Sequence, residues 1–437
     1  MGYSFQRYEN YKKVDDLAFD ELPVEWTLKK VKYLFTIGRG RVISQEELDD
    51  NGVFPVYSSQ TQNNGCLGFI HTYDFDCKQI TWTTDGANAG TVFLREGKHN
   101  CTNVCGTLQP ISKNLNFSFY LYSLQYVTQF YKRPDTNGAK IMNGEMAAIS
   151  LCIPSDYEQQ KIANFLDHET AKIDTLIAKQ EKLIELLKEK RQAVISHAVT
   201  KGLNPQAPMK DSGVEWLGEV PEHWEVTKLK WKTSTTSGGT PTTSKYEMYY
   251  KDGYIPWIRT TDLNNGKLLE TPVNITSKAL ADTACSILPK NSILLAMYGG
   301  AGSIGKHSLL MFEATINQAV CGIYPSSAFE SEFLHYFYEF YRPFWMINAA
   351  GTRKDPNIGQ DHIKEGKVVL PPVAEQRTIV AHINKTLALL DRLNVKATDA
   401  IELAKERKTA LISAAVTGKI DVRHFVAEQG QPQGVQG

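Results

Sequence analysis

The 437-residue sequence lacks the features that mark several classes of protein. Its longest apolar run, from Ile293 to Tyr298, is far shorter than the about 20 residues that a membrane-spanning helix needs. The N-terminus has no basic segment followed by an apolar one, so we expect a cytoplasmic protein rather than a secreted one. The seven cysteines are an odd number and form no CxxC pair, which suits free thiols in a reducing compartment.

An excess of charge and a catalytic motif are missing as well. The 48 Lys and Arg residues balance 48 Asp and Glu, which counts mildly against a chain that binds nucleic acid alone, because such chains are usually basic. Gly300–Lys306 scans as a phosphate-binding loop, but His307 stands where that loop needs a hydroxyl for Mg²⁺. His99, Cys101 and Cys105 lack a fourth ligand for zinc. We therefore expect no catalytic residue and no metal on this chain.

What the sequence does contain is an internal repeat. Ile184–Thr200 returns as Ile401–Thr417, at an offset of 217 residues without a gap. Each copy follows a longer stretch that repeats less faithfully, and this stretch includes Pro55–Gly65 in the first half and Pro256–Gly266 in the second. The period is too long for a solenoid. It predicts two modules, each made of one globular domain and one long helix.

Both long segments have the pattern of coiled-coil helices. Gly202 and Gly418 lie just past their ends, and apolar residues recur at heptad spacing. The residues expected to pack are Leu166, Ile173, Leu176, Leu183, Leu187 and Val194 in the first helix, and Ile383, Leu390, Ala397, Ala404 and Leu411 in the second. Large residues of one copy match alanines of the other, so an antiparallel coiled coil is predicted. At about 1.5 Å per residue, the first helix would run roughly 65 Å. The alternative, core helices of one large domain, fits this length poorly.

The globular stretches are typical of mixed α/β domains. Short β-rich runs such as Gln79–Thr83 are bounded by Gly and Asn turns, and an aromatic helix is expected near the end of each stretch. The predicted fold class is α+β, with a pseudo-twofold internal repeat. The expected parts are a first globular domain (1–154), a first helix (155–203), a linker and second globular domain (204–371), a second helix (372–420) and a C-terminal tail (421–437).

The repeated loops of the two domains are the strongest candidates for a binding role. Both keep a proline before and Asn-Asn-Gly after, but the polar residues between differ: Ser58, Ser59, Gln60 and Thr61 against Arg259, Thr260, Thr261 and Asp262. Such side chains read base edges in DNA, so one frame with different polar residues suits two readers of different sequences. An ordinary solvated loop is the alternative. The candidates for contacts to the DNA backbone are Lys132, Arg133, Lys140, Tyr298, Lys306, Arg353 and Lys354. The alternative is that they are surface residues without a binding role.

At this point the sequence resembles the specificity subunit of type I restriction–modification systems, over nearly its whole length. The resemblance is carried by Met209–Trp224 before the second domain, by its echo Asp20–Trp26 before the first, by the helix openings Pro154–Gln160 and Pro371–Gln376, and by Tyr298–Lys306 with Ala314–Ala319. The segment Met1–Asp20 matches the second linker poorly.

The resemblance implies two target-recognition domains, each reading one half of a bipartite, asymmetric site in double-stranded DNA, with the helix pair setting the gap. It implies no catalysis by this chain. Two methyltransferase subunits that bind S-adenosylmethionine would dock on the helices and domains, and restriction/translocase subunits that use ATP and Mg²⁺ would join them. Three alternatives stay open: a specificity subunit working with a methyltransferase alone, a coiled-coil adaptor that binds proteins, and a nucleotide-using enzyme built on Gly300–Lys306.

Overall fold

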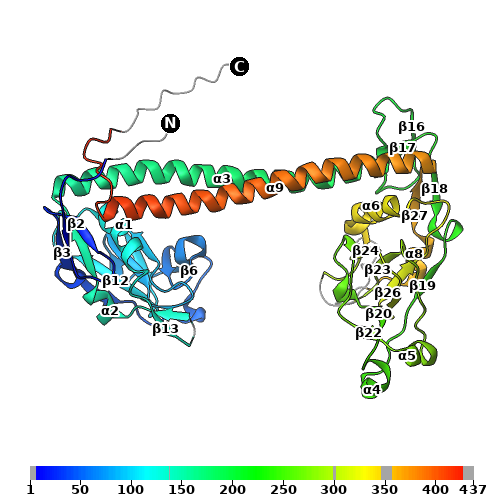
Figure 1. Cartoon of the computed structure of the whole chain (residues 1–437), viewed down its shortest axis with the longest axis horizontal. Helices are drawn as coiled ribbons and strands as arrows, with labels where there is room; N and C mark the ends of the chain where they lie inside the picture. The colour runs from blue at the N-terminus through cyan, green and yellow to red at the C-terminus, as the bar shows by residue number, and fades with distance from the viewer. Residues whose placement is uncertain (1–5, 137, 299–301, 346–356, 427–437) are drawn as a thin grey trace. The chain divides into compact units, whose positions relative to one another are not determined.

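The computed structural model describes residues 6–136, 138–298, 302–345 and 357–426 (Figure 1). The chain divides into two compact units, unit 1 (residues 1–181 and 398–437) and unit 2 (residues 182–397). Each unit combines a mixed α/β domain with part of each of the two long helices. Within the described ranges, no helix is both long and apolar enough to cross a bilayer.

Unit 1 is built on an antiparallel sheet in the order β10-β8-β12-β4. Its strands are β4 (Phe35–Arg39), β8 (Gln79–Thr83), β10 (Val92–Arg95) and β12 (Cys105–Pro110). Every residue of β8 is buried, and four of its five residues, Ile80 to Thr83, are β-branched or aromatic. Helix α1 (Phe117–Val127) begins where the Asn116 side chain accepts the Phe119 N–H, and it packs on this sheet with Tyr120 edge-on to Phe35.

A second sheet of unit 1 has the order β6-β5-β11-β7, in which β5 and β11 are parallel. Its strands are β5 (Phe54–Tyr57), β6 (Cys66–Ile70), β7 (Phe75–Asp76) and β11 (Lys98–Cys101). Smaller pairings complete the unit: β13 (Arg133–Asp135) with β14 (Gly138–Lys140) and β9 (Asp85–Gly86), β15 (Ser150–Ile153) with β3 (Thr27–Lys30), and β1 (Tyr11–Lys13) with β2 (Glu21–Pro23). The short helix α2 (Asn143–Ala148) precedes β15.

Unit 2 repeats this strand order. Its main sheet is β19-β26-β23-β24-β21, formed by β19 (Thr235–Ser237), β21 (Lys267–Leu268), β23 (Ile293–Ala296), β24 (His307–Leu310) and β26 (Val320–Ile323). A second sheet joins β22 (Asn274–Ile275), β20 (Ile255–Ile258) and β25 (Thr315–Ile316), with β20 and β25 parallel. The pairs β18 (Glu225–Lys228) with β27 (Lys367–Leu370) and β16 (Met209–Asp211) with β17 (Glu219–Pro221) match β3–β15 and β1–β2. The α-helices described in its domain are α4 (Tyr246–Tyr249), α5 (Ser277–Asp282), α6 (Ser331–Tyr341) and α8 (Gln360–Glu365). The two domains therefore share the order of four main-sheet strands and of three strands in the second sheet. Among the described strands, β21 of unit 2 and β7, β9, β13 and β14 of unit 1 have no counterpart.

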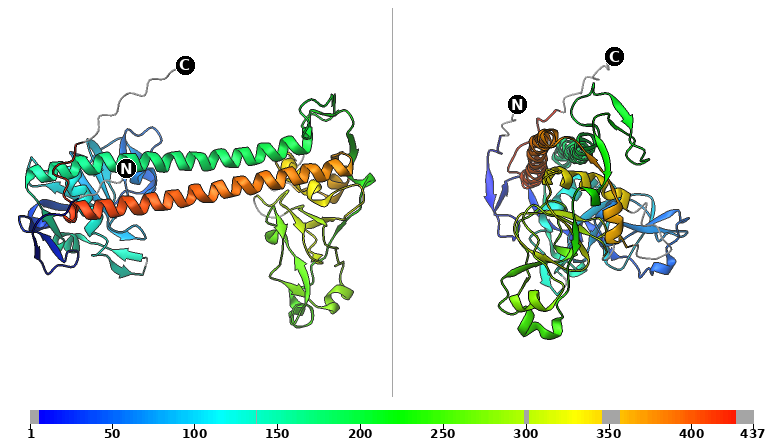
Figure 2. Two further views of the ribbon diagram at one scale, coloured as in Figure 1. Left: turned by 45° about the horizontal axis from the view of Figure 1, so that its top comes forward. Right: turned by 90° about the vertical axis from the view of Figure 1, so that its right-hand side faces the viewer.

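The long helices are α3 (Asp156–Lys201) and α9 (Val373–Val416), against predicted ranges of 155–203 and 372–420. In unit 1, Leu166 shares a buried cluster with Ile412, and Asp174 pairs with Lys408 at 2.7 Å. In unit 2, Arg191 pairs with Asp391 at 3.0 Å. Within each unit, the segments of α3 and α9 lie side by side (Figure 2). In unit 1 the later α3 residue meets the earlier α9 residue, so these segments run in opposite directions.

Two of the predicted packing residues lie outside the seam between the helices. Leu176 is 46% exposed and Leu183 is 38% exposed, so the expectation that they pack there was wrong. A heptad seam alternates steps of three and four residues. After Ile173 the next inward residue is Ile177, one position beyond Leu176. Of the other predicted residues, the buried ones are Leu166, Ile173, Leu187, Ile383, Leu390, Ala397 and Ala404, and the half-buried ones are Val194 and Leu411.

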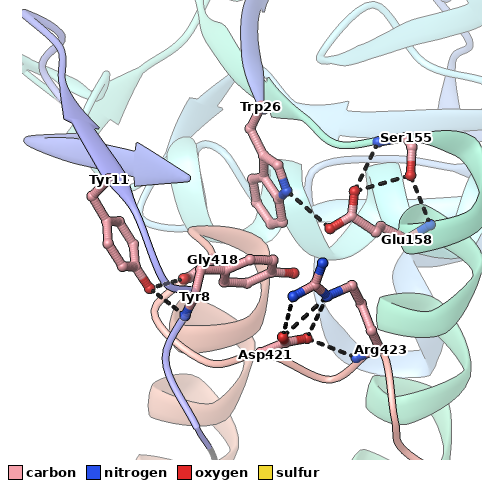
Figure 3. Close-up of polar contacts among 8 residues, drawn as sticks. All are labelled: Tyr8, Tyr11, Trp26, Ser155, Glu158, Gly418, Asp421 and Arg423. Atoms are coloured by element: carbon pink, nitrogen blue, oxygen red, sulfur yellow. Dashed lines mark hydrogen bonds and ion pairs between the residues drawn. The ribbon is translucent and has the colours of Figure 1, made fainter. Parts of the chain in front are cut away.

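The segment from Tyr8 to Trp26 and the segment from Gly418 to Arg423 meet at one corner of unit 1 (Figure 3). Trp26 is fully buried, and its indole N–H donates to a Glu158 carboxylate oxygen at 3.3 Å. The Tyr11 hydroxyl donates to the carbonyl of Gly418, which lies two residues past the end of α9 and has a φ of +70°. This positive φ is why a glycine stands there.

Unit 2 builds the same corner from continuous chain. A Cβ atom on Gly202, at the end of α3, would lie 3.2 Å from the Trp224 ring and 3.3 Å from Glu375. Residues 6–20 thus take in unit 1 the place that the linker before β17 takes in unit 2. The weak sequence match of these two segments hid this correspondence.

Candidate nucleic-acid interface

The predicted reading loop of unit 1 is a tight reversal between β5 and β6. The Ser58 N–H donates to the Gly65 carbonyl at 3.0 Å, and Asn63, Asn64 and Gly65 have positive φ values of 49°, 53° and 77°. Asn and Gly are the residues that adopt this conformation most readily. Ser58, Ser59 and Gln60 are half-buried, whereas residues 61–64 are exposed. The exposed tip therefore consists of Thr61 and the amide side chains of residues 62–64. The two asparagines among them were predicted from the sequence to be part of the shared frame, not reading residues.

A buried arginine that the sequence analysis missed supports this loop. Arg95, on β10, is 2% exposed. Its guanidinium lies 3.6 Å from the Tyr57 ring centre and donates to the Asn64 carbonyl at 2.8 Å. Burial lowers its pKa, and no carboxylate pairs with it among the residues described. An arginine in an otherwise apolar strand was the available signal, and its contacts make it a positioning residue for the loop tip.

The corresponding loop of unit 2 holds its own arginine. The Arg259 N–H donates to Asp262 at 2.8 Å, and the guanidinium donates to both oxygens of that carboxylate at 3.2 and 3.0 Å. The Arg259 side chain is still 38% exposed, against 8% for Asp262. Thr261 is exposed and Thr260 half-buried. A bidentate pair fixes the plane of the guanidinium, so the arginine is preorganised for a planar hydrogen-bonding partner.

The predicted backbone contacts of unit 1 lie on and beside the β13–β14 hairpin. Lys132 is exposed, Arg133 forms an ion pair with Glu145, and Lys140 pairs with Asp135 at 2.9 Å. The hydrogen bond from Lys140 lowers the pKa of Asp135. Phosphate binding by Arg133 or Lys140 would therefore exchange one anionic partner for another.

In unit 2, Lys306 lies next to the reading loop. The His307 N–H donates to the Asn265 side-chain oxygen at 3.3 Å, and the loop is further fixed by the Asn264 N–H, which donates to Ser308 at 3.0 Å. Tyr298 and Lys306 are half-buried. Arg353 and Lys354, also predicted as backbone contacts, lie outside the described residues.

The helices carry apolar side chains on their outer faces as well as in the seam. On α3 these are Leu176, Leu183 and Leu186, here called the outer leucines, and on α9 they are Leu389, Leu393, Val395 and Leu403. Their exposed fractions range from 38% to 67%. Exposed apolar side chains on a helix are a feature of surfaces that bind another protein.

Two separate segments of the chain, residues 23–186 and 221–403, match the family described as type I restriction modification DNA specificity domain. Together they make up more than half of the sequence, with one segment beginning in each unit. The chain belongs to this family. It is a type I specificity subunit, the non-catalytic DNA-recognition component of such systems.

Individual relatives agree with this membership. The chain is 43% identical over 139 residues to a Mycoplasma pneumoniae protein named as the N-terminus of the type I specificity subunit S.MpnORF289P, a match that covers 32% of this chain and 74% of that protein. It is 26% identical over 441 residues to the MjaVIII specificity subunit of Methanocaldococcus jannaschii, with 96% and 98% of the two chains covered. A solved chain from work on complex assembly and conformational transition of the type I R-M system shares the fold, with a TM-score of 0.67, 12% identity and coverage of 91% and 99%.

Proposed function

We propose that each unit of this specificity subunit reads one half of a bipartite, asymmetric site in double-stranded DNA. The observation that carries this proposal is the pair of reading loops, residues 58–65 and 259–265. Each follows the same strand of the shared topology, β5 in unit 1 and β20 in unit 2. Their exposed side chains differ, with hydroxyls and amides in the first and an arginine held by Asp262 in the second. Arginine pairs best with guanine and amides pair best with adenine, so different half-sites are expected.

The two long helices act in this proposal as an antiparallel coiled coil that sets the distance between the half-sites. The 46 residues of α3 would span about 69 Å at about 1.5 Å per residue. The ion pairs Asp174–Lys408 and Arg191–Asp391 support one register along the pair. The domain division is proposed as 1–154, 155–203, 204–371, 372–420 and 421–437, with the halves related by a pseudo-twofold axis.

Two methyltransferase subunits are proposed to dock on the helix pair, with the outer leucines supplying apolar contacts. They would carry S-adenosylmethionine, and restriction subunits would bring ATP and Mg²⁺. Positive groups on these partners would supply much of the phosphate binding that a chain of zero net charge lacks. We place the complex in the cytoplasm, where the seven cysteines, all free in the structure, stay reduced.

Loop exchange combined with methylation mapping tests this function. The chain and a type I methyltransferase are co-expressed, and methylated adenines are mapped by single-molecule sequencing. A split motif with a fixed gap is expected. Replacing residues 58–61 should change one half of the motif, and replacing residues 259–262 should change the other.

Replacing the exposed residues Ser112–Asn114, which precede α1, serves as the matched control and should leave the motif unchanged. A change in both halves, or in neither, refutes the assignment of the loops. A stable complex with a methyltransferase proven active elsewhere that leaves DNA unmethylated and shows no salt-dependent DNA binding supports a protein-binding adaptor instead.

A further inference from the structure

Unit 2 contains a cluster of three metal-ligating side chains that its role in DNA recognition does not use. His307 lies on β24, and His335 and Glu339 lie on α6. Glu339 follows His335 by four positions, so both side chains lie on one face of the helix. One ligand atom from each residue lies within 4.8 Å of the other two. His307 is fully buried and His335 is 4% exposed.

The two histidines are buried without the hydrogen bonds that such residues normally make. Both ring nitrogens of His307 and Nδ1 of His335 lack a partner in the part of the chain that the structure describes. Leaving a buried polar group unsatisfied costs about 1–3 kcal/mol. In unit 1, by contrast, the buried His99 has both ring nitrogens engaged, with Gly97 and Gln79, each at 2.8 Å. The two histidines of unit 2 therefore differ from His99, and a bound group would satisfy their free ring nitrogens.

The neutral state of the two histidines suits the binding of a cation. Burial lowers the pKa of His307 to about 3, with His335 adding to the shift, and burial lowers the pKa of His335 to about 4. Neutral imidazoles present the lone pairs that a metal needs. Burial also raises the pKa of Glu339, whose nearest cation, Arg191, is 3.9 Å away. Arg342, Lys267 and Glu332 are the other charges that act on the two histidines.

The spacing of the ligand atoms is slightly wider than a metal requires. A point within about 2.8 Å of all three atoms exists when none is more than 4.8 Å from another. Zinc–nitrogen bonds are about 2.0–2.1 Å long. Side-chain rotations that bring each atom closer by less than about 1 Å would complete the coordination, with water as the fourth ligand.

We propose that His307, His335 and Glu339 bind one zinc ion, or another divalent transition metal that prefers imidazole, and that this ion ties α6 to β24. The site is particular to unit 2. Counted from the helix start, the α1 residues that correspond to His335 and Glu339 are Leu121 and Gln125, and leucine cannot ligate a metal. The expectation of no metal on this chain is revised accordingly. His335 and Glu339 follow His307 by 28 and 32 residues in the sequence, a spacing that fits no familiar zinc motif.

Zinc binding to the full-length, untagged chain tests the proposal. The chain is stripped with a chelator and titrated with Zn²⁺ by calorimetry against a competing chelator. One tightly bound ion per chain is expected. Removing a direct ligand should cost at least as much as removing a second-shell partner, which typically weakens binding by about 10–100-fold. The variants Glu339→Gln and His335→Gln should therefore bind at least about 10-fold more weakly. The control His382→Gln replaces an exposed histidine of α9 and should bind as the parent does.

Cobalt substitution of the unaltered chain decides the ligand type without relying on the folding of a variant. Visible absorption of Co²⁺ bound to nitrogen and oxygen is expected. A strong thiolate charge-transfer band would place the metal on the cysteines and overturn the proposal. If the chain binds neither Zn²⁺ nor Co²⁺ at one equivalent, water bridges the histidines instead and the proposal is overturned. Ligand variants that retain the parental affinity would overturn it as well.

Discussion

Two adjacent leucines of α3 offer a sharp test of the helix seam. Leu187 is 9% exposed and belongs to the main core cluster of unit 2, whereas Leu186 is 48% exposed. Replacing leucine by alanine removes three carbon groups, each worth about 0.8 kcal/mol when buried. With the cavity that remains, Leu187→Ala should lower the free energy of unfolding by about 2–4 kcal/mol. Leu186→Ala removes the same atoms from a half-exposed position and should cost about 1 kcal/mol or less.

The comparison is made by urea unfolding, followed by the fluorescence of buried tryptophans such as Trp224, which shares the cluster with Leu187. Hydrogen exchange of the α3 amides then localises the loss to unit 2. Because both variants leave the same residue on the same helix, differences in helix propensity cancel. Equal losses, or a larger loss for Leu186→Ala, would refute the seam described here.

Three further predictions concern pH, the helix ends and the helix length. With a chelator present, the free energy of unfolding of unit 2 should fall as the pH drops from about 6.5 towards 4, by up to about 1.4 kcal/mol per pH unit for each of His307 and His335. The reason is that the histidines bind protons in the unfolded chain but stay neutral in the folded one. A pH-independent melting temperature in calorimetry would contradict their burial as neutral groups. In urea unfolding, Gly418→Ala should lower the free energy of unfolding more than Gly202→Ala. Both positions have a positive φ, but the new Cβ would lie 2.6 Å from Pro23 at position 418 and 3.2 Å from Trp224 at position 202. The reverse order would argue against the corner described in unit 1. Inserting four residues into both long helices, near residues 181 and 401, lengthens each helix by about 6 Å. The gap between the half-sites should then widen by one to two base pairs of about 3.4 Å, with both half-sites unchanged. An unaltered gap in methylation mapping would refute the proposal that the helices set this distance.

Repetition made most of this architecture predictable from sequence. A gap-free copy of a long heptad segment indicates two helices, and the β-rich run Gln79–Thr83 corresponds to β8 at both ends. The error at Leu176 and Leu183 has a simple cause. Leucines occur on more than one face of α3, and steps of three or four residues from Ile173 are equally compatible with the pattern.

The local chemistry of the loops was less predictable. No sequence pattern shows that Arg259 is held by Asp262, or that Arg95 reaches the loop tip from a neighbouring strand. The cluster of His307, His335 and Glu339 depends on how α6 packs against β24. Such tertiary contacts are set by packing between distant segments, and periodicity within one segment carries no information about them.

The corner of unit 1 where residues 8–26 meet residues 418–423 has a consequence for synthesis on the ribosome. The core of unit 1 includes Ile412, Ala415, Val416 and Val422 from the end of the chain, next to Trp26 and Leu166 from its first part. Unit 2 is a single continuous stretch. It can complete its core while translation continues, whereas unit 1 must wait, with apolar surface uncovered, for α9 to emerge. A nascent chain interrupted before residue 412 would therefore hold a finished second unit and an unfinished first one, a state that chaperones and proteases can distinguish from the complete protein.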